Sequence, residues 1–387
     1  MTPKTRKPKR SSQGPIVLWH GMNLRNMVGM LARRPPMHWS RAHRIALLPV
    51  LTAWNSAMSL LENVLYAKKV RQTEISKPPV FILGFWRSGT TLLHNLITRD
   101  PNFTYPNSYQ VFFPTHFLAT GKIVPKLTRS LLPNTRPMDN VKFGWDLPQE
   151  DEFALATMTM LSPYILPLFP DDYSVYQKTF DFAGVDSKLL NKWKNALDVL
   201  IRKVTIASED DGKQKTVVLK SPGHTYRVPT LLEMYPKAKF IYIYRDPANV
   251  FNSSVHMRKT LVRENELGCS PLVGHEDEVI RTYKHAFECY ERDRALIPQG
   301  NLHEIRFEDL EAKPLAELGH VYDGLNLDGF SKLRSILEPE IPAIKQYKKN
   351  RFEPDLALMM RVYEELKPAF DRFGYDSPLE AANRPAA

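Results

Sequence analysis

The sequence contains few cysteines and no recognisable export signal. Only Cys269 and Cys289 occur among 387 residues, and their spacing matches neither a metal knuckle nor a redox pair. A disulfide framework is therefore not indicated, and a reducing compartment is compatible with the chain. The basic amino terminus is followed by Ser11-Ser-Gln-Gly14 and not by a compact apolar run, so no secretory signal is predicted. We expect a cytoplasmic protein. Peripheral association with a membrane remains open.

The sequence also lacks an uncharged apolar run of full membrane-spanning length. The longest candidate, residues 45–61, contains Pro49 and is shorter than the roughly 20 residues that a span needs. Apolar side chains recur here at helical spacing, namely Leu47, Leu51, Trp54, Met58, Leu61 and Leu65. We expect an amphipathic helix over residues 41–68 that packs this stripe on the rest of the protein. The alternative is peripheral membrane contact through residues 45–65.

Acidic residues are outnumbered by basic ones. The 53 Lys and Arg exceed the 42 Asp and Glu, which gives a formal net charge of +11. Such an excess suits an anionic ligand, substrate or membrane, and does not choose among them. Residues 1–40 begin with a basic arm, which is typical of a solvated, disordered tail more often than of a nucleic-acid element. We expect no nucleic-acid partner, and a single domain over residues 41–387.

Strand-like and helix-like segments alternate along that domain. Short apolar runs that end in a turn or a cation are typical of buried parallel strands, and they lie at residues 80–83, 216–219, 240–244 and, more weakly, 302–307. Helical patterns follow at residues 90–97 and 227–235, and Asp246-Pro247 is a typical helix start. The order predicts an α/β fold, a P-loop-like three-layer α/β/α arrangement around a central parallel sheet. Helical insertions are expected at about 100–212 and 257–300.

A glycine-rich loop follows the first predicted strand, but it lacks the lysine of a nucleoside triphosphatase. Gly84 and Gly89 keep the G-x-x-x-x-G spacing, while Thr90 stands at the lysine position. That lysine reaches the β- and γ-phosphates of a triphosphate, so this loop is poorly suited to one. Backbone amides from Arg87 to Thr91 can instead hold a single phosphate at the start of the helix. A nucleotide or small-molecule kinase, with Thr91 on magnesium, remains the alternative.

A second anion site is predicted after the third strong strand. Arg245 ends that strand, and Ser253 lies eight residues later, two turns into the next helix. Lys220 ends the strand between the two sites. Because ligands bind at the carboxyl ends of parallel strands, a nucleotide with two separated phosphates would meet both sites. A later basic cluster at residues 345–351 is interpreted as a solvated helix face.

The two segments FWRSGTT (residues 85–91) and YRDPANVFNS (residues 244–253) resemble the cofactor signatures of sulfotransferases that use 3′-phosphoadenosine 5′-phosphosulfate. The RSGTT form is similar to the bacterial, carbohydrate and tyrosylprotein branches of that family. The resemblance implies this donor as co-substrate, with no metal. It implies that the 5′-phosphosulfate is bound by Arg87, Ser88, Gly89, Thr90 and Thr91. It further implies that Arg245 and Ser253 bind the 3′-phosphate and that Phe307 lies beside the adenine.

Sulfonate transfer to a hydroxyl or amine needs charge stabilisation and a base. Lys220 and Arg87 are the candidates for the first role. Where cytosolic family members carry a histidine, this chain has Pro222, so the candidate bases are Glu150 and Glu152. An alternative is that these carboxylates only begin a helix, where the macrodipole favours them. The acceptor, a small molecule, glycan, lipid or peptide, and the oligomeric state are not indicated.

Overall fold

The computed structural model describes residues 16–132, 142–209, 212–342 and 355–382. The first basic arm and the basic cluster at residues 345–351 therefore lie outside the described residues. A five-stranded sheet forms the centre, and every strand pairing within it is parallel. The strands are β1 (Val80–Leu83), β2 (Phe103–Thr104), β3 (Thr216–Lys220), β4 (Lys239–Tyr244) and β5 (Leu302–Arg306). The predicted strands are confirmed to within a residue.

The strand order is β2-β3-β1-β4-β5. Strand β3, which ends at Lys220, and strand β4, which Arg245 follows, therefore flank β1. The loops after these three strands emerge side by side at the carboxyl edge of the sheet. The edge strand β2 was not predicted, because two residues are too few to show a period. It lies inside the segment expected to be mostly helical and pairs Phe103 with Thr216.

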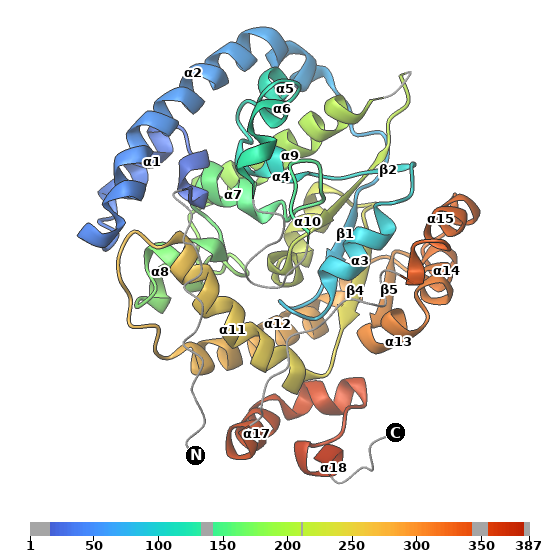
Figure 1. Ribbon diagram of the computed structural model, residues 1–387. Coiled ribbons are helices and arrows are strands. Elements are labelled where there is room, and N and C mark those ends of the chain that lie inside the picture. Colours follow the sequence, from blue (N-terminus) through green and yellow to red (C-terminus); the bar gives the residue numbers. More distant parts are fainter. Residues whose placement is uncertain (1–15, 133–141, 210–211, 343–354, 383–387) are drawn as a thin grey trace.

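Helices cover both faces of the sheet, as Figure 1 shows. Side chains of a strand alternate between faces, so Phe81 and Leu83 enter one core while Val80 and Ile82 enter the other. The first core is covered by α7 (Glu152–Thr159), α9 (Ser187–Ser208), α11 (Pro247–Asn265), α12 (His275–Asp293) and α17 (Leu356–Phe373). The second is covered by α3 (Thr90–Ile97), α13 (Phe307–Ala312), α14 (Pro314–Gly324) and α15 (Phe330–Leu337). The predicted three-layer α/β/α fold is confirmed.

The remaining elements are mostly short. They are η1 (Leu18–Gly21), α1 (Leu24–Ala32), η2 (Trp39–Arg41), α2 (Ala42–Gln72), α4 (Ser108–Phe112), α5 (Phe117–Thr120), α6 (Val124–Thr128), η3 (Arg129–Leu131), η4 (Pro163–Leu168), α8 (Tyr173–Gln177), η5 (Pro222–Tyr226), α10 (Val228–Met234), η6 (Arg294–Leu296) and α18 (Pro378–Ala382). The expected insertions contribute α7, α9 and α12, and so build much of the layer over the first core.

The expectation of a disordered tail fails for residues 16–40. These residues form η1 and α1, and they bury Trp19, Met22 and Met30 completely. The Trp19 indole also donates a hydrogen bond to the carbonyl of Asn265 at 2.8 Å. The apolar residues of this segment therefore join the core, and its prolines and arginines misled the sequence-based expectation.

The expected amphipathic helix exists as α2, which runs along the outer margin of the molecule (Figure 1). The prediction of which face of this helix packs on the protein is wrong. Its apolar stripe is half-buried at best, and Leu61 and Leu65 are 44% and 60% exposed. The neighbouring side of the helix, which is largely polar, is buried instead and includes Arg44, Thr52 and Asn55. The reason is that these polar groups find hydrogen-bond partners inside the protein.

Candidate active site

The loop after β1 is shaped by two glycines. Gly84 has φ +142°, and a Cβ there would lie 2.5 Å from the carbonyl oxygen of Ile243. Gly89 has φ +101°, and its Cβ would lie 2.2 Å from the ring of Phe307. Between them, the Ser88 hydroxyl donates a hydrogen bond to the Phe85 carbonyl at 2.8 Å. The loop is thus closed on itself and pressed against β4 and Phe307.

The loop leads directly into α3, whose first residue is Thr90. Ser88 and Thr90 are buried, and Thr91 is half-buried. Backbone amides at a helix start are free to bind an anion. The predicted 5′-phosphosulfate residues therefore occupy one continuous loop and helix start, as the sequence suggested, although their role as ligands stays a prediction.

The second predicted anion site lies directly beside this loop. Arg87 adopts a left-handed backbone with φ 69°, and its Nε donates a hydrogen bond to the Ser253 hydroxyl at 2.8 Å. Arg245 donates from Nη1 to the Arg87 carbonyl at 3.3 Å, and its guanidinium lies 4.4 Å from the centre of the Phe307 ring. Arg87 thus meets Arg245 and Ser253 in one cluster, although they are 158 and 166 positions away from it in the sequence.

The cluster fits a doubly phosphorylated nucleotide on two observations. The Nε of Arg245 is buried and has no hydrogen-bond partner among the described residues. Such a donor is costly to leave unpaired, and a phosphate oxygen would satisfy it. Burial also lowers the pKa of Arg245 from its ordinary value, but a guanidinium keeps its charge at neutral pH. In addition, Gly89 is the N-cap of α3 and has no side chain to bond the first amides of this helix, so those amides can receive a phosphate.

The helix that carries Ser253 starts as predicted. Asp246 caps α11 by accepting a hydrogen bond from the Ala248 amide at 2.9 Å, and Pro247 is its first residue. Ser254, one position after Ser253, donates to the Trp86 carbonyl at 3.1 Å. The helix and the loop after β1 are therefore fixed relative to each other.

Lys220 and Glu150 form a buried ion pair at the end of β3. The Nζ of Lys220 lies 2.6 Å from Oε1 of Glu150, and the lysine side chain is 2% exposed. Lys220 is therefore not a solvated cation at the end of its strand. Glu150 also accepts a hydrogen bond from the Tyr164 hydroxyl, which itself accepts one from the Trp86 indole at 3.0 Å. A chain of hydrogen bonds thus joins the loop to the candidate base.

Tyr164 was not anticipated, since nothing in its sequence context marks it. Burial, and then the negative charge of Glu150, raise the pKa of Tyr164 well above its ordinary value. The phenol therefore stays protonated and remains a donor to Glu150. Its ring stacks on Phe153 at 4.8 Å with an interplanar angle of 11°, which fixes its orientation. Tyr164 acts as a positioning residue for Glu150.

The other two residues of the acidic run bind different partners. Asp151 lies 2.7 Å from Nε2 of His224, and both side chains are completely buried. Glu152 accepts two hydrogen bonds from Arg227, at 2.8 and 3.2 Å, and one from Ser221 at 3.2 Å. Glu152 is also the first residue of α7, as the helix-start alternative expected. The Glu152 side chain is completely buried against Arg227, whereas that of Glu150 is 12% exposed and faces Lys220, so the geometry favours Glu150 as the base.

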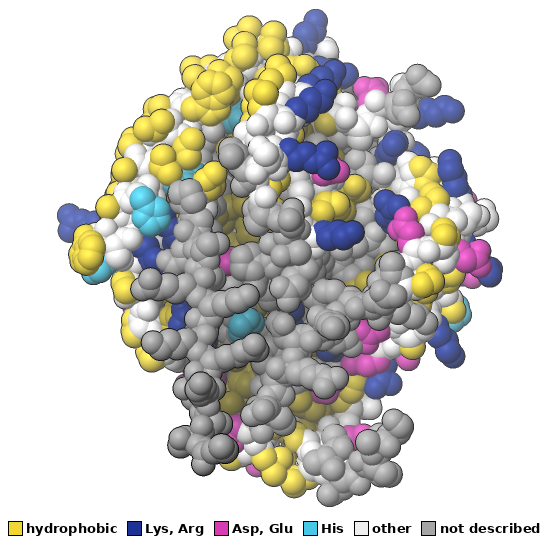
Figure 2. All heavy atoms as spheres, viewed as in Figure 1, with side chains coloured by type: hydrophobic (Ala, Val, Ile, Leu, Met, Phe, Trp, Pro, Cys, Tyr) yellow, Lys and Arg dark blue, Asp and Glu magenta, His cyan; other side chains and the backbone are white. Residues whose placement is uncertain are grey.

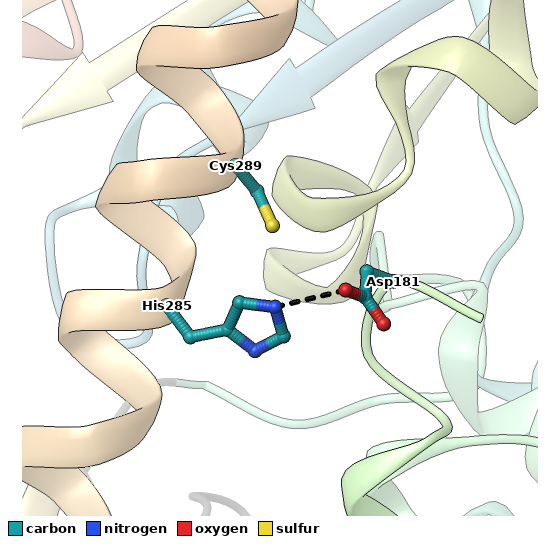
Figure 3. Close-up of side chains that lie close together, drawn as sticks. All are labelled: Asp181, His285 and Cys289. Carbon is teal, nitrogen blue, oxygen red and sulfur yellow. Dashed lines mark hydrogen bonds and ion pairs between the residues drawn. The ribbon is translucent and has the colours of Figure 1, made fainter. Parts of the chain in front are cut away.

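A separate polar cluster lies away from this site, between α12 and the loop before α9 (Figure 3). Asp181 accepts a hydrogen bond from Nε2 of His285 at 3.0 Å, and the buried thiol of Cys289 points toward the same ring nitrogen. Hydrogen bonds with Asp181 and Cys289 raise the pKa of His285 to about 10. The ring is therefore an imidazolium at neutral pH, and the cluster is most simply an ion pair.

The strand order, the loop after β1 and the neighbouring Arg87 and Arg245 together define an α/β transferase with a candidate anion-binding site in two parts. Residues 78–332 match the sulfotransferase family, and the chain belongs to this family. The family implies 3′-phosphoadenosine 5′-phosphosulfate as the donor, and the kinase alternative is set aside. The resemblance of the two segments to sulfotransferase signatures is confirmed.

Two relatives extend the likeness over nearly the whole chain. The omega-hydroxy-beta-dihydromenaquinone-9 sulfotransferase Stf3 of Mycobacterium tuberculosis is 34% identical over 372 residues, which cover 95% of this chain and 94% of the relative. The Mycobacterium bovis protein of the same name matches to the same extent. The likeness therefore includes the amino-terminal segment outside the family match.

Solved structures show the same fold at lower identity. Sulfotransferase STF9 of Mycobacterium avium has a TM-score of 0.62 and 17% identity, over 93% of this chain and 92% of the other. Sulfotransferase STF1 of M. tuberculosis has a TM-score of 0.61 and 16% identity, over 89% of this chain and 90% of the other. At such identities the comparison supports the fold alone.

Proposed function

We propose that this sulfotransferase moves the sulfonate of 3′-phosphoadenosine 5′-phosphosulfate to the terminal hydroxyl of a lipid acceptor of the hydroxylated menaquinone class. The observation that carries the proposal is the 34% identity to Stf3 over 95% of the chain. That relative is named as a sulfotransferase of an omega-hydroxylated dihydromenaquinone. A likeness of this extent covers the variable helical segments that form acceptor walls, and not only the shared nucleotide site.

Donor binding is assigned to the two neighbouring anion sites. The amides and hydroxyls of the loop from Arg87 to Thr91 would hold the 5′-phosphosulfate. Arg245 and Ser253 would hold the 3′-phosphate, with Phe307 beside the adenine. The hydrogen bond from Arg87 to Ser253 supports this assignment, because it places the arginine between the two sites. Arg87 can then serve either phosphate with a charge-assisted hydrogen bond.

The transfer is assigned to the buried pair at the end of β3. When bound, the donor supplies the sulfonate, which exchanges its bond to the phosphate oxygen for a bond to the acceptor oxygen, in line. Glu150 takes the proton of the acceptor hydroxyl, since it is the carboxylate of the acidic run that faces Lys220. Lys220 donates a hydrogen bond to the leaving phosphate oxygen, where negative charge develops. Arg87 adds positive charge from the loop, and Tyr164 orients the base.

Acceptor preference can be measured with purified protein and radiolabelled donor. Detergent-dispersed menaquinone carrying a terminal hydroxyl should be sulfated, whereas the same lipid without that hydroxyl should not. A phenol and a hexose serve as the competing acceptor classes. Efficient transfer to the phenol or the sugar, with none to the hydroxylated lipid, would refute the acceptor assignment while leaving the sulfotransferase assignment intact.

A matched pair of variants tests the assignment of Lys220. The chain has a second buried lysine–glutamate pair, Lys203 with Glu62, on α9 and α2. Lys220→Met should lower turnover with little loss of nucleotide affinity, while Lys203→Met should lower stability and leave turnover per folded molecule unchanged. Equal turnover losses in the two variants would contradict the role given to Lys220.

A further inference from the structure

Helix α2 presents its apolar side outward. Its buried residues are largely polar, and each has an internal partner. Arg44 donates to the carbonyls of Arg263 and Glu266 at 3.2 and 3.0 Å. Asn55 donates to the carbonyls of His20 and Met22 at 2.7 and 2.8 Å. These bonds fix the rotation of the helix about its axis, and Trp54, Leu61 and Leu65 of the apolar stripe are exposed as a consequence.

Large apolar side chains consequently gather on the outside of α1, η2 and α2. On α2 the exposed ones are Val50, Trp54, Leu60, Leu61, Val64 and Leu65; on α1 and around η2 they are Leu24, Val28, Leu31, Met37 and Trp39. Val64 is 84% exposed and Trp39 is 83% exposed. Figure 2 shows hydrophobic side chains along the margin that α1 and α2 form in Figure 1. An apolar surface of this extent marks an interaction site, which we name the α1–α2 face.

The exposed charges that the α1–α2 face itself carries have one sign, and outside it Glu209 pairs with Lys69. From residue 16 to residue 72 the sole acidic residue is Glu62. Glu62 is buried and pairs with Lys203. It also accepts hydrogen bonds from the backbone amides of Leu118 and Ala119. Exposed basic residues lie near both ends of the face, namely Arg25, Arg33, Arg34, Lys68, Lys69 and Arg71. Apolar side chains flanked by lysine and arginine complement a bilayer that contains anionic lipids.

The buried polar groups decide between lying on a membrane and crossing it. The segment Trp39–Gln72 is long and apolar enough to cross a membrane, and only 22% of its most apolar window is buried. Crossing would separate α2 from the protein and bring Arg44, Asn55 and Glu62 into hydrocarbon without their partners. Unpaired polar groups there are very costly. The helix therefore suits the interface plane, with its polar side on the protein.

We propose that the α1–α2 face docks this protein on the surface of an anionic lipid bilayer, with α2 lying in the plane of the headgroups. Trp39 and Trp54, which is 50% exposed, would sit at headgroup level, where tryptophan is favoured. The flanking arginines and lysines would contact lipid phosphates. The inference stands on the surface itself, and it holds whether or not the acceptor proposed above is correct.

Vesicle binding tests the inference with the full chain and no donor. Co-sedimentation is measured with vesicles of phosphatidylglycerol and phosphatidylcholine, and with phosphatidylcholine alone. The protein should prefer the anionic vesicles, and salt should weaken the binding. Leu60→Glu with Val64→Glu should reduce the partition coefficient at least about a hundredfold, because each lost apolar contact is worth about tenfold. The matched control, Val273→Glu with Leu356→Glu, changes residues that are 71% and 50% exposed elsewhere, and should bind normally.

Tryptophan fluorescence gives an independent measurement. Of the six tryptophans, Trp39 and Trp54 are exposed, whereas the other four are buried or half-buried. Vesicles should shift the emission to the blue, and brominated lipids should quench it. Trp39→Phe with Trp54→Phe should abolish both effects while the protein still sediments with vesicles. An emission that does not change on vesicle binding would contradict the proposed orientation.

Two outcomes would overturn the inference. One is equal vesicle binding by Leu60→Glu/Val64→Glu and the unsubstituted protein. The other is a dimer in light scattering that this double variant dissociates, with no vesicle binding, since a second copy would then cover the face. Transfer to a detergent-dispersed acceptor should be unchanged in the double variant. Failure of docking and failure of the proposed reaction are therefore measured separately.

Discussion

Replacing Glu150 by glutamine separates its proposed role as base from its role as partner of Lys220. The amide oxygen can still accept the hydrogen bond from Lys220, and the amide nitrogen then lies beside the Tyr164 hydroxyl, which can accept from it, so the shape of the pair is largely kept. The proton acceptor is lost. General-base catalysis contributes about 10²- to 10⁴-fold, so we expect kcat to fall by that factor at saturating donor and acceptor. Affinity for 3′-phosphoadenosine 5′-phosphate should change little, because Glu150 is not placed at either phosphate.

Stability has to be measured alongside turnover, because the substitution also removes a buried charge. Breaking a buried ion pair by deleting one partner costs about 3–5 kcal/mol, and glutamine should cost less since its oxygen remains. Glu62→Gln provides the control, as it alters the other buried lysine–glutamate pair in the same way. Urea melts, nucleotide titration and radiolabelled transfer are compared for both variants. A Glu150→Gln enzyme that turns over within tenfold of the original, with a stability loss like that of Glu62→Gln, would refute the assignment of the base.

Three further predictions concern the anion sites and the ion pair of α12. Arg245→Ala should weaken binding of 3′-phosphoadenosine 5′-phosphate by about ten- to a hundredfold, since a charge-assisted hydrogen bond is worth about 1.5–3 kcal/mol. Calorimetry should show this with kcat unchanged at saturating donor, and an unchanged affinity would move the 3′-phosphate site elsewhere. Gly89→Ala should abolish nucleotide binding and lower Tm, because its Cβ would lie 2.2 Å from the Phe307 ring at φ +101°; normal binding would show that the loop adjusts freely. The pKa of His285 is raised from 6.5 to about 10, so its stabilisation is complete below pH 6.5 and is lost as the pH rises to about 10. Over that range the free energy of unfolding should fall relative to His285→Gln by up to about 1.4 kcal/mol per pH unit, and parallel pH profiles in urea melts would contradict the ion pair with Asp181.

The loop after β1 was readily predicted because its residues are local in sequence. A loop between a strand and a helix has a fixed spacing, and the parallel sheet brings the ends of β3, β1 and β4 together. The acidic run was harder to interpret. Glu150, Asp151 and Glu152 are indistinguishable by pattern, yet they bind Lys220, His224 and Arg227, respectively.

Those three partners come from β3 and the segment after it, about 70 residues away. No local rule pairs residues over such a separation, so only the packing of α7 against η5 could show which carboxylate faces the site. Tyr164 was missed for the same reason, because its one distinguishing feature is the short path from Trp86 to Glu150.

The sequence by itself determined four of the five strands, the loop that we expect to bind phosphate and the helix starts, because backbone geometry and hydrophobic periodicity act over a few residues. Only the tertiary structure decided which side of α2 is buried. Periodicity located its apolar stripe correctly, but the distant carbonyls and amides that bind Arg44, Asn55 and Glu62 rotate the helix so that Trp54, Leu61 and Leu65 of that stripe are exposed. A buried polar group with partners is stable, whereas one without partners is costly, and partners that lie far along the chain become visible only when the chain is folded.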